Sequence, residues 1–95
     1  MEKTQKLKLI NGNFSPKDAK DVLMNLFLGK IQFHQTVNFS SKERLGIEDK
    51  NALKRIDQLK KSLEKISKLI SKAELKNETL TITSEISIVF SKSKF

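Results

Sequence analysis

The sequence of 95 residues has no cysteine, tryptophan or tyrosine, and only one proline, three glycines and one histidine. Without cysteine it can form no disulfide framework, no thiolate-ligated zinc site and no thiol nucleophile. Three glycines are too few for a phosphate-binding or dinucleotide-binding loop. No segment approaches the roughly 18 apolar residues that a membrane span needs, and residues 1–15 lack the apolar core of a signal peptide. We therefore expect no membrane association and a cytoplasmic location.

The charge is strongly basic but is carried almost wholly by lysine. Lysine and arginine together number 19 against 11 acidic residues, so the formal net charge is 19 − 11 = +8. Arg44 and Arg55 are the two arginines. Because arginine is the residue favoured for bidentate recognition of bases and phosphates, this balance favours a solvated surface over a sequence-reading one.

The first half of the chain predicts a strand followed by a helix. Residues 5–10 alternate polar and apolar side chains, which is typical of a half-buried strand with Leu7 and Leu9 facing inward. Asn11-Gly12 should end that strand, because both residues tolerate positive φ. Ser15 can then cap a helix over residues 16–38, with Pro16 at its first position.

The second half predicts a longer helix and a second strand. Residues 39–48 form the connection, in which Ser40 caps a single turn and Gly46 ends it. A helix over residues 49–76 carries apolar residues at alternating steps of three and four, a heptad seam that packs on the first helix. The seam residues are Ile56, Leu59, Leu63, Ile66, Ile70 and Ala73.

Residues 79–90 alternate again and predict a second strand, followed by a basic tail over residues 91–95. The predicted order is β-α-α-β in a single small α+β domain, residues 1–95. Two long helices with a short connection must run antiparallel, which places the two strands side by side and antiparallel. We therefore expect an antiparallel strand pair packed against a long helical hairpin.

The predicted second strand is about twice as long as the first, which suggests self-association. An isolated two-stranded ribbon is marginal in water, and a long unpaired edge invites another chain. A homodimer that completes the sheet would resolve both problems; the alternative is that the helices of the same chain cover the excess. The candidate interface residues are Ile82, Ile86, Ile88 and Phe90 of the strand, and Phe39 and Arg44 of the connection.

No grouping of residues predicts catalysis, a metal site or a cofactor. His34 is the only histidine, and a transition-metal site would need carboxylates for nearly all its other ligands. His34 also falls on the apolar stripe of the first helix, where a core or boundary role is the usual one. We expect a protein that is not an enzyme.

The second helix is the most basic part of the chain. Residues 50–72 contain eight basic and two acidic residues, a net charge of 8 − 2 = +6. Lysines on the side away from the heptad seam could follow a nucleic-acid backbone or an acidic partner. These candidates are Lys54, Lys61, Lys65, Lys68 and Lys72. No aromatic residue is interleaved with them, so a stacking platform for single strands is absent.

Two function hypotheses follow from the sequence. The first is a small non-enzymatic interaction module that binds another protein or a second copy of itself. The second is a nucleic-acid-associated protein that binds without sequence specificity through the basic side of the second helix. The residues do not identify the partner in either case.

Overall fold

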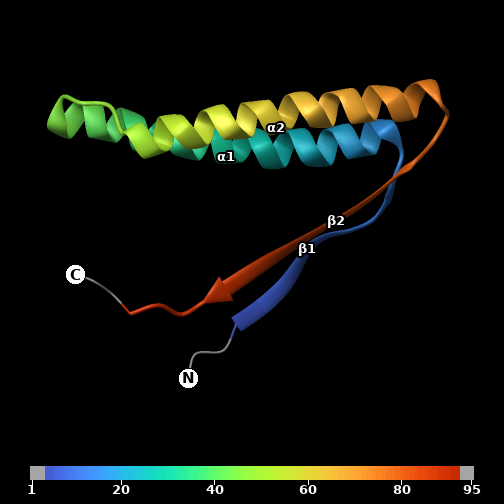
Figure 1. The fold of residues 1–95 in the computed structure, drawn as a ribbon, viewed down its shortest axis with the longest axis horizontal. Coiled ribbons are helices and arrows are strands. Elements are labelled where there is room, and N and C mark those ends of the chain that lie inside the picture. The colour runs from blue at the N-terminus through green and yellow to red at the C-terminus, as the bar shows by residue number, and fades with distance from the viewer. Residues whose placement is uncertain (1–3, 93–95) are drawn as a thin grey trace.

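The computed structural model describes residues 4–92 and has the predicted α+β class and β-α-α-β order. The elements are β1 (Thr4–Phe14), α1 (Pro16–Leu45), α2 (Lys50–Leu75) and β2 (Leu80–Val89). The two helices form an antiparallel hairpin, and β1 and β2 form an antiparallel two-stranded sheet (Figure 1). Residues 93–95 of the predicted tail lie outside the described residues.

Helix α1 begins as the sequence predicts. The Ser15 side chain accepts a hydrogen bond from the backbone N–H of Asp18, at 3.1 Å, and Pro16 occupies the first helical turn. This capping supplies a partner for one of the N–H groups that a helix leaves unsatisfied at its start.

The end of α1 corrects the prediction of a helix over residues 16–38 and a connection over residues 39–48. The helix continues to Leu45, so Ser40 lies inside it and caps nothing. Gly46, which was predicted to end a single turn in the connection, instead ends α1 itself, in the left-handed conformation that glycine adopts without steric cost. The connection is therefore only residues 46–49.

Two side chains of α1 hold this short connection in place, which explains why polar residues near position 40 do not break the helix. Asn38 Oδ1 accepts a hydrogen bond of 2.7 Å from the backbone N–H of Asp49. The Ser41 hydroxyl donates one of 2.9 Å to the carbonyl of Ile47. Residues with turn-forming side chains thus support the turn from within the helix rather than forming it themselves.

Helix α2 confirms the predicted seam. Asp49 caps it by accepting from the backbone N–H of Ala52, at 2.9 Å. Ile56 and Leu59 are buried and form the core of the hairpin with Ile31 of α1, and Phe27 packs against that cluster. At the far end, Asn77 takes a positive φ and ends the helical path.

Strand β1 extends four residues beyond the predicted range of residues 5–10. Asn11 and Gly12 do not end it, because they pair with Thr83 and Ile82 of β2. The Asn13 side chain also donates to the Thr81 hydroxyl at 3.0 Å across the strands. A long partner strand thus overrides the local turn preference of Asn11-Gly12. With 11 and 10 residues, the two strands match in length, so the mismatch that suggested a dimer is not present.

A register shift between Lys8 and Ile10 reverses the alternation of β1. Such a bulge places one extra residue, here Leu9, opposite the partner strand. Ile10 rather than Leu9 is therefore the buried residue of β1. The prediction that Leu7 and Leu9 both face a core is wrong: the bulge displaces Leu9 from the alternation, and Leu7 lies on the apolar face of the ribbon but is exposed.

The hairpin and the ribbon formed by β1 and β2 meet at one end and diverge from there (Figure 1). The molecule is thin, with principal extents of 51 × 39 × 15 Å. Where the two parts meet, Leu80 and Ile82 of β2 face Leu23 of α1 and Leu69 of α2 across a shallow hollow. The hairpin thus covers only the beginning of β2, and the rest of the ribbon projects away from it.

Candidate protein interface

One face of the ribbon carries a row of apolar side chains that runs from the covered end to the bare end. The register places Leu80 opposite Phe14, and Leu7 opposite Ile86. Because side chains alternate along a strand, Ile82, Ile86 and Ile88 share the face of Leu80. The first half of this row is half-buried or buried, whereas the second half is not.

The bare half consists of Leu7, Ile86 and Ile88. Their exposed fractions are 55%, 40% and 45%. Scattered apolar residues on a surface are ordinary, whereas a contiguous apolar group on a β-sheet face is a surface at which a partner could bind. We call these three residues the bare face.

Both edges of the ribbon are unpaired in the described part of the chain, since the sheet contains only β1 and β2. Each edge presents a row of backbone N–H and C=O groups without a strand partner. A two-stranded ribbon is marginal in water unless it packs against a helix or is joined by further strands. Here the packing is confined to one end, so the ribbon has little of its own to stabilise it.

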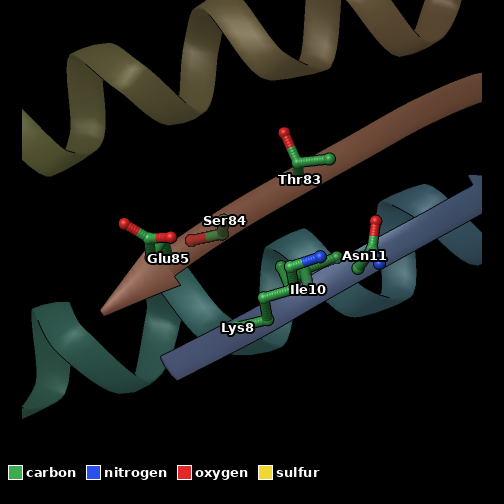
Figure 2. A pocket seen from close by; sticks show the side chains of 6 residues that line it. All are labelled: Lys8, Ile10, Asn11, Thr83, Ser84 and Glu85. Atoms are coloured by element: carbon green, nitrogen blue, oxygen red, sulfur yellow. The ribbon is translucent and has the colours of Figure 1, made fainter. Parts of the chain in front are cut away.

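A shallow hollow of about 380 Å³ lies at the bulge, where Lys8, Ile10 and Asn11 of β1 meet residues of β2. Figure 2 shows six side chains gathered there from both strands. Ligand sites are typically concave and mostly apolar, whereas this hollow is open and lined mainly by polar side chains. Lys8 and Glu85 face each other in the register, although their charged groups do not come within 4 Å of each other.

The candidate interface residues fall into two separate groups. Ile82 is half-buried near the hairpin, and Ile86, Ile88 and Phe90 are exposed along and just after β2. Phe39 and Arg44 lie in the last turns of α1 rather than in a loop, and both are exposed. They sit at the closed end of the hairpin, far from the end at which the ribbon joins it (Figure 1). The structure does not bring the two groups together.

The candidate lysines of α2 are all exposed. Lys61 forms an ion pair of 3.1 Å with Asp57, one turn earlier. Glu64 and Lys68 have the same spacing of four residues but form no ion pair within 4 Å. The five side chains are Lys54, Lys61, Lys65, Lys68 and Lys72, and they follow the side of α2 opposite the buried seam.

His34 is half-buried on α1, and its ring meets that of Phe33 edge-on with centroids 5.3 Å apart. Within residues 4–92, no three histidine, aspartate or glutamate side chains gather where they could hold a metal ion. No buried charged or polar side chain occurs in the same range. His34 lines an open hollow together with Asp49 and Arg55, and it forms no ion pair with an acidic side chain among residues 4–92.

The comparisons with known proteins give no relative from which a role could be transferred. The chain matches no protein-family model, and the searches of curated proteins and of solved structures found no match. Over the part of the chain that the structure describes, neither helix combines the length and apolar character that crossing a membrane requires.

Sequence reasoning identified the apolar residues of β2 but missed their partner on β1. Leu7 was expected in the core, and only the pairing with Ile86 shows that it extends the bare face. The sequence holds one sign of the bulge, because the alternation of Leu7 and Leu9 breaks at Ile10 and an extra residue in a strand shifts the alternation by one.

Proposed function

We propose that this protein is a non-enzymatic interaction module that binds a protein, either another chain or a second copy of itself, through the β1–β2 ribbon. One observation carries the proposal: among residues 4–92, the ribbon is long, has no strand partner on either edge and is bare on the apolar face formed by Leu7, Ile86 and Ile88. A strand added to such an edge gains main-chain hydrogen bonds, and side chains on alternate positions supply specificity.

The helical hairpin has a supporting role in this proposal. Its core of Ile31, Ile56 and Leu59 contains no residue of the ribbon. The hairpin can therefore keep its structure whether or not a partner is bound to the ribbon. It anchors the ribbon at one end through Leu80 and Ile82 and leaves the other end accessible. A rigid support with a projecting strand pair suits capture of a partner by β-strand addition.

The test compares three immobilised baits: the wild-type chain, Ile86→Lys/Ile88→Lys, and Lys54→Glu/Lys61→Glu/Lys68→Glu. Each bait is offered the purified untagged chain and, separately, a lysate of the source cells. We expect the ribbon variant to lose the bound protein and the lysine variant to keep it, because only the former places charges on the bare face. Circular dichroism checks that both variants retain the helical hairpin.

The lysine variant also serves as the matched control, since its positions are exposed and lie outside both the bare face and the seam. A folded Ile86→Lys/Ile88→Lys bait that retains the same bound proteins as the wild type would remove the ribbon from the proposal.

A second candidate function is sequence-independent binding of nucleic acid by α2. The observation in its favour is the spacing of Lys54, Lys61 and Lys68, which repeat every seven residues and are all exposed. Counterion release makes such binding fall steeply with salt. The same lysine variant decides the matter: it would then lose affinity for a random DNA duplex in a fluorescence-anisotropy titration, while the ribbon variant would keep it.

A further inference from the structure

The two edges of the ribbon are not equally suited to pairing with another strand. Strand β1 carries Lys6 and Lys8 and is interrupted by the bulge. Lysines and bulges are the features by which natural proteins keep sheet edges from pairing. Strand β2 has neither, and Glu85 is its only charged residue. The free edge of β2 is therefore the one open to a further strand.

A second copy of β2 fits that edge in one register. In an antiparallel pair related by a two-fold axis, one residue faces its own copy, and the apolar faces of both copies lie on the same side of the sheet. The greatest overlap that β2 allows places either Ser84 on the axis, with residues 80–88 paired, or Glu85, with residues 81–89 paired. Two facing glutamates would repel each other, whereas two facing serines can form a hydrogen bond. Ser84 is thus the residue expected at the axis.

This register pairs the bare half of one ribbon with the covered half of the other. Ile86 would face Ile82 of the second copy, and Ile88 would face Leu80. Ile82 and Leu80 are the half-buried residues beside the hairpin, so each copy gives the exposed isoleucines of the other an apolar neighbour. On the opposite face, Glu85 would lie between its own Lys8 and Thr83 of the second copy.

From these observations we infer that the partner of the ribbon is a second copy of this chain, joined through antiparallel β2 edges about an axis at Ser84 into a four-stranded sheet. The inference rests on the proposed function and names its partner. The choice of the β2 edge follows from the lysines and the bulge of β1. The register about Ser84 follows from the charge of Glu85 and from the division of the ribbon into a covered half and a bare half.

The test uses single-cysteine variants, which are unambiguous because the chain has no cysteine of its own. The Ser84→Cys variant should form a symmetric disulfide under mild oxidation, since facing residues of paired strands lie within disulfide reach. Ser87→Cys is the matched control on the same strand. In this register its two copies are offset by about 20 Å, six residues at about 3.3 Å each. We expect Ser84→Cys to cross-link faster by about tenfold or more.

Sedimentation equilibrium of the wild-type chain accompanies the cross-linking and should give twice the mass of 10.9 kDa. A monomer at high micromolar concentration would overturn the inference, as would equal cross-linking of Ser84→Cys and Ser87→Cys. If the wild type is monomeric but another protein is still captured in a ribbon-dependent way, the second-copy inference fails and the proposed function stands. If ribbon-dependent capture is also absent, both fail.

Discussion

At the scale of single residues, the glycine that follows α1 and the glycine inside it have opposite roles. Gly46 ends α1 with φ of 71°, a conformation that costs a residue with a Cβ atom about 1 kcal/mol or more. Gly29 lies inside the same helix, is exposed, and has open space where a Cβ would stand. Glycine is thus required at one position and is only a source of chain entropy at the other.

Alanine substitutions at these two glycines should therefore shift stability in opposite directions. Gly46→Ala should lower the free energy of unfolding by about 1 kcal/mol, and Gly29→Ala should raise it by about 0.5–1 kcal/mol. Urea denaturation followed by circular dichroism measures both. A change of the same sign in the two variants would contradict the assignment of Gly46 to the helix end.

At the scale of elements, the seam of α2 holds the hairpin together. Leu59 and Leu69 are both leucines of this helix, yet their exposed fractions are 8% and 58%. Truncating a buried leucine removes its transfer free energy and leaves a cavity, whereas truncating an exposed one does little.

Leu59→Ala should therefore destabilise the protein by about 2–4 kcal/mol, and Leu69→Ala by less than about 1 kcal/mol. Thermal or urea unfolding of the two variants beside the wild type gives the comparison. Equal losses would mean that the hairpin does not depend on the seam between Ile56 and Ile70.

Local patterns in the sequence predicted the elements well where one signal acted alone. The heptad seam, the Ser15 cap and the Gly46 stop all depend on spacing or backbone preference within a few residues. The boundaries were wrong where tertiary partners decided the outcome. Asn11-Gly12 belongs to a strand because β2 continues beside it. Residues 39–45 belong to a helix because the side chains of Asn38 and Ser41 form hydrogen bonds to the backbone of the connection that follows.

The candidate interface could be only half predicted for the same reason. Alternation in β2 identified Ile82, Ile86 and Ile88, but how much of each is exposed depends on where the hairpin ends its contact with the ribbon. The point at which the ribbon separates from the hairpin depends on how all four elements are arranged, and the periodicity of a single strand does not encode it.

At the scale of the whole molecule, the divergence of ribbon and hairpin is the feature from which the proposed role follows (Figure 1). The hairpin has its own core, and the ribbon shares in it only at the end marked by Leu80 and Ile82. A chain built in this way has a stable part and a part that another strand can complete. We expect β2 to become a central strand on binding.

Residue-resolved hydrogen exchange of β2 in the full chain, at high micromolar concentration, is the most direct test of whether β2 becomes a central strand. In an unpaired ribbon, alternate amides of β2 face β1 and the others face water. The account predicts slow exchange at both sets over residues 81–87, with protection of the outward set lost in Ile86→Lys/Ile88→Lys. If every second amide of the wild type instead exchanges as fast as in an unfolded chain, β2 remains an edge strand and the account is contradicted.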